Sequence, residues 1–548
     1  MKKVTFKQYN MNQPSLLPPS LEELIPEDHL VRVVNRMVDS IDITPLLVKY
    51  KGGGTSSYHP RMMLKVLVYA YAEKIFLSRR IAKGLRENVN FMWISGGNKP
   101  DFRTINLFRG ETMKAAVREV FASVLELLVE GGYVKMENYF VDGTKVEANA
   151  NPHKVVWAKK TKKYKDRLRA QIMELLDEIE KVNQAEEEAY GDEDLEELGG
   201  KGGIDAEKLQ RKVDELNQRL QQQSENKQLK KAVKTLEKKH LPRLEKYEAQ
   251  EQILAGRSSY SKTDPDATCF RMKEDRAAEK PLPRPAYNVQ IGTEGQFIIG
   301  YSIHQRAGDP GCFIPHMQQQ KFPQDRKVQN LSGDAAYGSE ENYAYLEEQQ
   351  IGNHLKYNTF YRETHPPRKE ELIQKASFRV ENLPYDPDKD QFTCPAKHPL
   401  TYRETRPYRT ENGYLTEHRF YECSECDTCP LKPQCTKAEG NRRIQISFKL
   451  REYRQQAKAN LLSEQGIALR KQRGPDVEGA FGNIKHNMGV RRFRLRGLKK
   501  SGNRVGFTRN CTQSTQTGGP LTASFFNFLV LRTFFPLFCN LFRQPLVL

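Results

Sequence analysis

Long apolar runs are almost absent from this chain of 548 residues. The N-terminus, MKKVTFKQYNMNQPSLLPPS, has no apolar segment, so it is not a signal peptide. Only residues 524–548 are strongly apolar, and Arg532, Pro536 and Arg543 interrupt them, which disfavours a membrane-spanning helix. The 9 cysteines cluster, a pattern that favours bound metal or free thiols over a secreted disulfide framework. We therefore expect a cytoplasmic protein with no membrane partner.

Acidic residues are in deficit. The chain has 88 Lys and Arg against 69 Asp and Glu, which gives a formal net charge of +19. This surplus indicates a polyanionic partner, and we favour nucleic acid over a generally basic surface that only keeps the protein soluble. The length is enough for two to four domains, each with its own core.

Residues 1–132 are expected to form an all-helical N-terminal domain that binds DNA. Ser20 begins a Ser-x-x-Glu capping signal, Pro60 stands where a first helical turn tolerates proline, and the pattern ends at Gly131–Gly132. Four basic residues could share one side of a DNA-binding module, and the alternative is an ordinary solvated face. They are Arg79, Arg80, Lys83 and Arg86.

An α/β core is expected in two parts, residues 133–158 and residues 256–375. Tyr139–Val141 form a buried strand with Asp142 at its end, and 286–303 form a hairpin around a turn at Thr293–Gln296. A helix at 309–320, a strand at Val328–Ser332 that runs into Asp334, a helix capped by Ser339 and a strand at 353–358 follow. Strands that alternate with helices are typical of an α/β fold.

A coiled-coil-like helical hairpin is expected between these parts, at residues 159–255. Leucine, isoleucine and valine recur there with 4-3 spacing, and the two runs end at an acidic, glycine-rich tip. The runs are Leu168, Ile172, Leu175, Ile179, Val182, and Leu209, Val213, Leu216, Leu220, Leu229, Val233, Leu236. The expected role is a strut, and dimerisation or DNA clamping is the alternative.

Two aspartates follow apolar strands in the same way, and a third acid lies near the end of the chain. Asp142 and Asp334 would repel each other unless a cation lies between them. Glu478 falls in residues 446–500, where we expect Pro475 to open a helix and Lys485 to project on the same side two turns later. Three such acids suit two-metal phosphoryl transfer, with Asp142 bridging two Mg²⁺ ions.

Four segments, VDGTKVEANA, YNVQIGTE, GDAAYGSEEN and VEGAFGNIKHNMGVRRFRLRG, resemble the bacterial insertion-sequence DDE transposases. The resemblance covers residues from about 5 to about 500, and it is nearest to the branch with a helical N-terminal domain and a cysteine-rich insertion. It implies an RNase H-like mixed sheet flanked by helices, two Mg²⁺ or Mn²⁺ ions, and a homodimer acting on double-stranded DNA, both transposon ends and target. It implies Asp142, Asp334 and Glu478 as catalytic metal ligands.

Basic residues around Glu478 are expected to contact DNA. Glu478 and Lys485 fit half of a related Tyr-x2-Arg-x3-Glu-x6-Lys signature. The other half departs, because Lys471 and Gly474 stand at its Tyr and Arg positions, with Arg473 one residue early. The expected DNA-binding residues are Lys485, Arg473, Arg491, Arg492 and Arg494.

Five cysteines lie in a small insertion at residues 376–445. The spacing of Cys423 and Cys426 is that of a metal knuckle, and a zinc ion takes four ligands. A structural zinc is favoured over reduced thiols, and an iron–sulfur cluster is the other metal that such ligands would suit. The candidate ligands are Cys394, Cys423, Cys426, Cys429 and Cys435.

The tail, residues 501–548, does not continue the amphipathic pattern. Reading suitable codons one base later from Ser501 gives a well-formed helix start, so we expect a frameshift that replaced the native C-terminus. The alternative is a genuine apolar extension.

The expected function is cut-and-paste DNA transposition by a cytoplasmic, nucleoid-associated enzyme. One alternative is another two-metal nuclease on the same core. The other is a decayed copy that binds DNA without catalysis.

Overall fold

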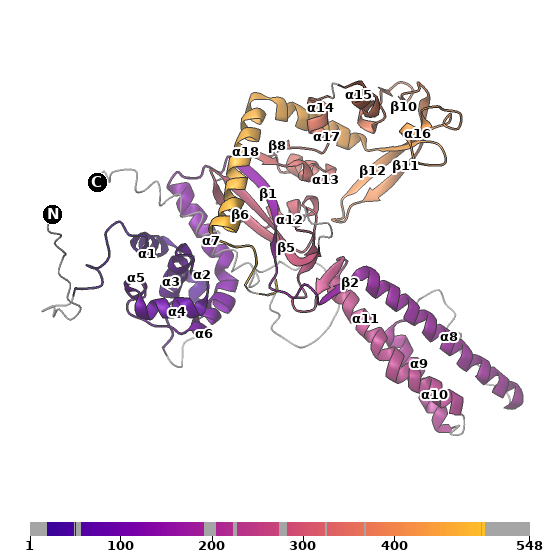
Figure 1. The fold of residues 1–548 in the computed structure, drawn as a ribbon, viewed down its shortest axis with the longest axis horizontal. Helices are drawn as coiled ribbons and strands as arrows, with labels where there is room; N and C mark the ends of the chain where they lie inside the picture. Colours follow the sequence, from indigo (N-terminus) through magenta and orange to yellow (C-terminus); the bar gives the residue numbers. More distant parts are fainter. Residues whose placement is uncertain are drawn as a thin grey trace, which may run out of the picture.

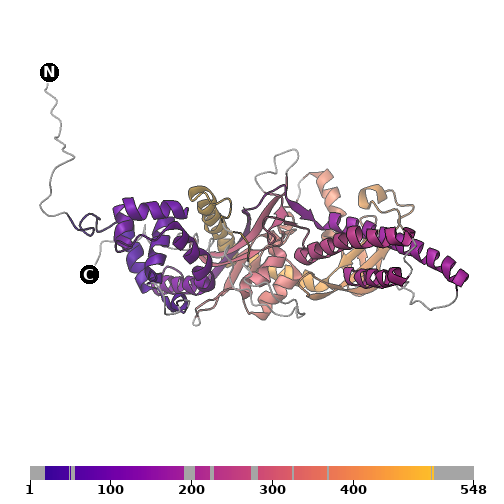
Figure 2. The same cartoon turned by 90° about the horizontal axis from the view of Figure 1, so that it is seen from below.

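The structure is a computed structural model that describes residues 19–48, 50, 56–190, 204–222, 227–272, 282–323, 326–366, 369–494 and 496–498. Figures 1 and 2 show an elongated molecule. Helices of the N-terminal region form one end, a mixed sheet occupies the middle, and a helical arm and a second sheet extend from the other end.

The N-terminal region is helical, as predicted. Its elements are α1 (Leu30–Ser40), α2 (Thr44–Leu47), α3 (Pro60–Ala72), α4 (Ser78–Glu87), α5 (Val89–Ile94), α6 (Phe102–Leu107), the π-helical turn η1 (Phe108–Thr112) and α7 (Met113–Glu130). Pro60 is the first residue of α3. The prediction that Ser20 starts a helix is wrong, because its hydroxyl only accepts a bond from Glu23 N within a turn (3.2 Å), and α1 begins after its N-cap, His29.

The central sheet has six strands, β1 (Asn138–Glu147), β4 (Thr268–Phe270), β5 (Arg284–Glu294), β6 (Phe297–His304), β7 (Asn330–Gly333) and β8 (Gly352–Leu355). The order is β4-β5-β1-β7-β8, and β6 pairs with β5. β1 runs antiparallel to β5 and parallel to β7, and β7 runs parallel to β8. This curled mixed sheet is compatible with an RNase H-like fold. The predicted hairpin is confirmed, with its turn at Gly295–Gln296.

Helices cover both faces of the sheet (Figure 1). α18 (Glu464–Gly482) and the N-terminal region pack against the face that holds Phe140 and Ile291. The other face holds Tyr139 and Val141 and is covered by α12 (Pro310–Gln318), α13 (Glu340–Glu348) and α17 (Phe448–Leu462). The predicted Ser339 cap of α13 is confirmed by its bond from Asn342 N. β1 was expected to end at Asp142, but it continues to Glu147 because pairing with β5 persists after pairing with β7 stops.

The insertion is an arm of three helical segments rather than the predicted two-helix hairpin. The first two segments are α8 (Ala158–Tyr190) and α9 (Ala206–Gln222). The third is continuous through α10 (Lys227–Thr235), the π-helical turn η2 (Leu236–His240) and α11 (Leu241–Leu254). The predicted seam residues lie in one core cluster, except Val182, whose side chain is outside the described part. The second run lies in two helical segments, α9 and α10 with its continuation η2, which pack in the same cluster as α11. The ribbon of β2 (Val155–Trp157) and β3 (Ser259–Ser261) joins the arm to the core.

A second sheet has the order β13-β12-β11-β10-β9. Its strands are β9 (Tyr385–Asp386), β10 (Gln391–Thr393), β11 (Pro399–Arg409), β12 (Leu415–Cys423) and β13 (Arg443–Ile446). Short helices accompany it, α14 (Phe360–Thr364), α15 (Glu370–Ser377), the 3-10 turn η4 (Val380–Asn382) and α16 (Lys432–Cys435). Buried Glu340 ties this sheet to α13, since it accepts bonds from Thr416 and Ser447 at 2.6 Å each.

Candidate active site

Asp142 and Asp334 follow neighbouring residues of two parallel strands. The register pairs Val141 of β1 with Gly333 of β7, and each aspartate is the next residue. Because successive side chains of a strand alternate, Asp142 points to the same face as Phe140, the face that α18 covers. Both aspartates are half-buried. Asp334 also caps the turn η3 (Ala335–Tyr337) by accepting a bond from Ala336 N at 2.9 Å.

A glycine stands next to each aspartate where the packing leaves no room for a side chain. A Cβ on Gly143 would lie 2.6 Å from Asp309 Oδ1 and would overlap Gln290. A Cβ on Gly333 would lie 2.6 Å from Leu355 and 3.0 Å from Val141. The backbone that carries both aspartates is therefore held by close contacts on its far side.

A buried polar network lies behind Asp142, and the sequence analysis missed it. Gln290 donates to Asp309 at 3.0 Å, Asn288 donates to the same oxygen at 2.8 Å, and Tyr337 donates to Gln290. Burial raises the pKa of the Tyr337 hydroxyl well above its usual value, and the charges of Asp309, Asp142 and Asp334 raise it further. The alternation in YNVQIG carries a signal for this network, because it leaves Asn288 and Gln290 on the face opposite the apolar residues.

Arg473 of α18 faces Asp142 directly. Its Nη2 lies 3.3 Å from Asp142 Oδ2, and the two side chains are 13% and 20% exposed. Lys356 and Arg470 belong to the same basic group. Burial lowers the pKa of Lys356, and the nearby charges of Arg473 and then Arg470 lower this pKa further. Arg473, predicted as a DNA contact, thus contacts a predicted catalytic carboxylate.

Glu478 is also on α18, but the prediction that Pro475 opens this helix is wrong. α18 begins eleven residues earlier, at Glu464, with Ser463 as its N-cap, and Pro475 is inside it. Packing against the sheet keeps the helix continuous there, since Val477 and Ala480 are buried in the same cluster as Phe140. The Glu478 side chain is exposed. Asp476 is the buried acid of this turn, and burial raises its pKa.

The DNA contacts predicted beyond Glu478 lie in a different local structure. Asn483–Asn487 form a π-helical turn, η5, so the expected 100° spacing from Glu478 to Lys485 does not hold. Arg491 and Arg494 are exposed. Arg492 donates to the carbonyls of Ala148 and Ala150 at 3.0 Å each, which attaches this segment to the end of β1.

The five predicted cysteines line one small cavity of about 20 Å³ in the second sheet region. They are free thiols, and burial raises the pKa of the Cys423 thiol to about 11. N–H groups point at the sulfurs, since His398 N donates to Cys394 at 3.3 Å and the Arg442 side chain donates to Cys435 at 2.9 Å.

In the part of the chain that the structure describes, no three Cys, His, Asp or Glu side chains are spaced as ligands of one metal ion. This holds both for the three acids and for the cysteines. The roles predicted for Asp142, Asp334, Glu478 and the cysteines therefore stay predictions. Among the same residues, no helix has the length and apolar character needed to span a membrane.

Two family models match the chain. A Transposase DDE domain matches residues 393–511, and a Transposase domain (DUF772) matches residues 19–111. The first match contains Glu478 and the cysteine segment but neither Asp142 nor Asp334. Searches of curated proteins and of solved structures find no match.

Proposed function

We propose that this chain catalyses metal-dependent cleavage and strand transfer at the inverted-repeat ends of a mobile element. The two family matches support this proposal, since both are to transposase domains. A transposase acts on DNA, which agrees with the net charge of +19. The observation that carries the proposal is that Asp142 and Asp334 directly follow Val141 and Gly333, which pair in the parallel strands β1 and β7. Proteins of this class use divalent metal in general.

The donor chemistry of the two aspartates fits Mg²⁺ or Mn²⁺, which prefer oxygen ligands. Two half-buried carboxylates at neighbouring strand positions favour a cation between them. In this structure the positive charge beside Asp142 is the guanidinium of Arg473. We propose Asp142 and Asp334 as ligands, with exposed Glu478 of α18 as the third. When bound, the ions would activate the attacking oxygen and stabilise the leaving oxygen of an in-line displacement.

The residues of this chain would position the DNA and the carboxylates. Gly143, Gln290 and Asp309 fix the backbone behind Asp142 by close contact. Arg473 would exchange Asp142 for a DNA phosphate once metal neutralises the carboxylate, since a guanidinium binds either anion. Phosphates beside the cut strand would be contacted by Lys485, Arg491, Arg492 and Arg494. The enzyme would act as a homodimer in the cytoplasm, at the nucleoid.

Cleavage of a plasmid that carries the DNA flanking the gene tests this function. Wild type should cut at the element ends with Mg²⁺, and Asp334→Asn should lower cleavage on the order of a thousandfold. DNA binding by this variant should stay near the wild-type value, because the aspartate contacts metal rather than phosphate. Unchanged cleavage by Asp334→Asn would contradict the assignment.

Variants of Glu478 and Asp476 in the same assay show which acid of α18 takes part in cleavage. Glu478→Gln should abolish cleavage, whereas Asp476→Asn should leave it within about tenfold, because Asp476 is buried against the backbone of Gly295 and Gln296. The exposure of Glu478 favours a second candidate, a DNA-binding copy without catalysis. Binding with no cleavage under Mg²⁺ or Mn²⁺ would select it.

We also propose a structural zinc held by four of the five cysteines around the small cavity. Sulfurs that accept N–H bonds are typical of zinc-binding cysteines, and those of Cys394 and Cys435 accept such bonds here. The ion would have to draw the sulfurs together. Metal analysis of the purified protein should find one zinc per chain, and Cys426→Ser should lose it. Retention by both Cys426→Ser and Cys423→Ser would contradict the site.

The proposed frameshift concerns residues 501–548, which lie outside the described part of the chain. The DDE-domain match extends to residue 511, past Ser501. The nucleotide sequence of the gene tests the idea, since a stop codon within a few codons in the alternative frame would refute it.

A further inference from the structure

The first turns of α8 carry a high density of positive charge. Residues 154–169 contain eight Lys or Arg and a single acid, Asp166, and the first turn of α8 has no acidic residue. The positive end of a helix dipole lies at the N-terminus, so lysines there cost the helix about 0.3–1 kcal/mol each. A charge pattern that opposes helix stability indicates an anionic partner.

Four lysines here are not used inside the protein. Lys165 is buried and pairs with Glu251 at 2.6 Å and with Glu248 at 3.6 Å, as a structural lysine does. The other four lysines in the first turns of α8 are exposed, and none forms an ion pair with any residue that the structure describes. We call Lys159, Lys160, Lys162 and Lys163 the arm base.

The arm base is connected to the predicted DNA contacts beyond Glu478. Arg496 donates to Asn149 O at 2.7 Å, and Asn149 donates to Arg494 O at 2.8 Å, only nine residues before α8 begins. Arg494 also lies over the ring of Phe76, 5.7 Å from its centroid, just before α4. Arg494 and Arg496 therefore lie between the N-terminal region and the connection to the arm.

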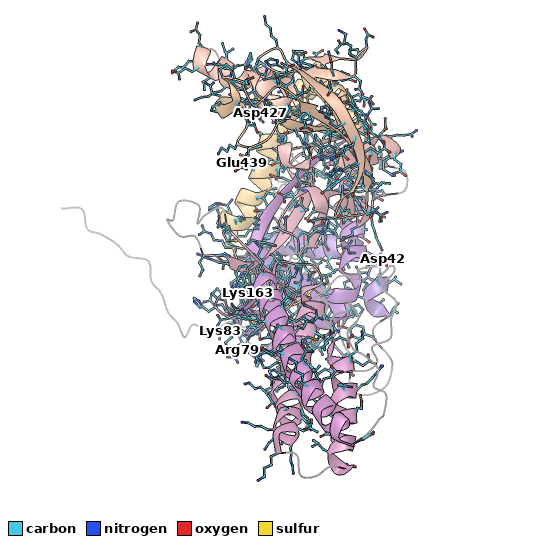
Figure 3. All side chains as sticks on the ribbon, turned by 90° about the vertical axis from the view of Figure 1, so that its right-hand side faces the viewer. Asp42, Arg79, Lys83, Lys163, Asp427 and Glu439 are labelled. Carbon is cyan, nitrogen blue, oxygen red and sulfur yellow. The ribbon has the colours of Figure 1, made fainter. Side chains whose placement is uncertain are left out.

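Basic residues of α4 and of α8 lie on the same side of the molecule. Figure 3 looks along the long axis of Figure 1, and the labelled Arg79 and Lys83 of α4 fall on the same side as Lys163 of α8. Asp42 lies on the opposite side. Basic residues along one side of a protein can bind the phosphates of a DNA duplex, because the duplex carries one negative charge per about 1.7 Å of its axis.

We propose that the arm base binds the phosphates of duplex DNA, so that the insertion is a DNA-binding arm and not only a strut. This rests on the proposed function, in which the same DNA occupies the candidate active site. Phosphate contacts carry no sequence information, so the arm would hold DNA outside the recognised ends. The acidic tip of a second copy is the competing partner for these lysines.

Binding of the full chain to a duplex of random sequence, measured by fluorescence anisotropy over a series of salt concentrations, tests the proposal. The arm-base variant carries Lys159→Gln, Lys160→Gln, Lys162→Gln and Lys163→Gln. Its affinity should fall tenfold or more at about 0.1 M salt, and the slope of log K against log salt should decrease by about 2–4. The matched control changes four exposed lysines of α10, Lys227, Lys230, Lys231 and Lys234, to Gln, and it should bind like wild type.

Equal losses in the two variants, or no loss in the arm-base variant, would overturn the proposal. So would a shift in oligomeric state without a change in DNA binding, which would select the second copy as partner. If the quadruple variant does not fold by circular dichroism, the pair Lys159→Gln and Lys163→Gln replaces it with an expected slope change of about 1–2. Wild type that binds and cleaves DNA while the arm-base variant binds equally well would refute only this inference. Wild type that fails to cleave would refute the proposed function.

Discussion

The guanidinium of Arg473 lies 3.3 Å from the carboxylate of Asp142, across the interface between α18 and β1. The Arg473 Nε is buried and has no hydrogen-bond partner in the described part of the chain. A side chain with an unsatisfied buried donor gains from a second anion, and a DNA phosphate would supply it. Arg473 thus stabilises the charge of the Asp142 carboxylate, which a bound metal ion would also stabilise.

Arg473→Ala should make the protein depend more on divalent metal. Without the guanidinium, Asp142 loses its cation while Asp334 stays at the neighbouring strand position, so the melting temperature without metal should fall. Saturating Mg²⁺ should then raise the melting temperature more in the variant than in wild type. Arg451→Ala is the control, because Arg451 lies over the rings of Tyr385 and Phe448, outside the candidate site. An equal Mg²⁺ response in all three proteins would contradict the competition.

Gly143→Ala should impair cleavage more than DNA binding. The added methyl would meet Asp309 and Gln290, so the strand or the polar network must move, at a cost of about 1–3 kcal/mol. Asp142 is the adjacent residue and would shift with the strand. Gly440→Ala is the control, since nothing lies within 4 Å of its Cβ position. Urea unfolding and plasmid cleavage measure the two effects, and wild-type cleavage by Gly143→Ala would exclude tight packing as a requirement.

Glu294→Gln should destabilise the core by about 2–4 kcal/mol. The Glu294 carboxylate is buried and accepts four backbone N–H bonds of 2.6–3.0 Å from Lys135, Met136, Glu137 and Asn138, where the chain enters β1. A glutamine would place its NH₂ against two of these donors. Exposed Glu137→Gln should change the unfolding free energy by less than about 0.5 kcal/mol. Equal stability of the two variants would contradict the role of the carboxylate.

Stability should decrease as the pH falls below about 6.5. Burial, with Arg306 and Arg118 adding to it, lowers the pKa of His304 to about 4, and burial lowers the pKa of His316 well below its usual value. Between the unfolded pKa of about 6.5 and these folded values, only the unfolded chain gains the protons. Each histidine should then remove up to about 1.4 kcal/mol per pH unit.

His316→Gln isolates this effect. It removes the ring that bonds the hydroxyls of Tyr139 and Ser302, so it should lower stability at pH 7.5. It should also reduce the slope of stability against pH below 6.5, whereas exposed His153→Gln should not. Urea unfolding between about pH 7.5 and 4.5 measures the slope, and an unchanged slope in His316→Gln would show that His316 is protonated in the folded state.

The sequence predicted the central sheet because its strands are strongly apolar and its turns have clear signals. Tyr139–Val141 and the hairpin at Gly295–Gln296 needed only local patterns. The end of β1 could not be read in this way, because it depends on which partner strand continues beside it. The start of α18 was misread because Pro475 suggested a first turn, whereas packing on the sheet carries the helix through it.

The candidate site was predictable only in part. Asp142 and Asp334 shared a pattern that placed both after strands, and pairing of β1 with β7 joins them. The partners of Asp142 were not predictable, since Arg473 comes from a helix 331 residues later and Asp309 contacts it through Gly143 and Gln290. The charge of the arm base is visible in the sequence, but only the fold shows that Arg494 and Arg496 contact Asn149, in the connection that leads to α8.

Iron-directed cleavage of the protein backbone tests the central claim, that Asp142 and Asp334 bind a divalent ion together. Fe²⁺ that replaces Mg²⁺ generates hydroxyl radicals in the presence of ascorbate and cuts the chain close to its ligands. Wild type should be cut near residues 142 and 334, excess Mg²⁺ should suppress both cuts, and Asp334→Asn should lose both. Cuts elsewhere, or cuts near residue 142 that persist in Asp334→Asn, would contradict a shared metal site.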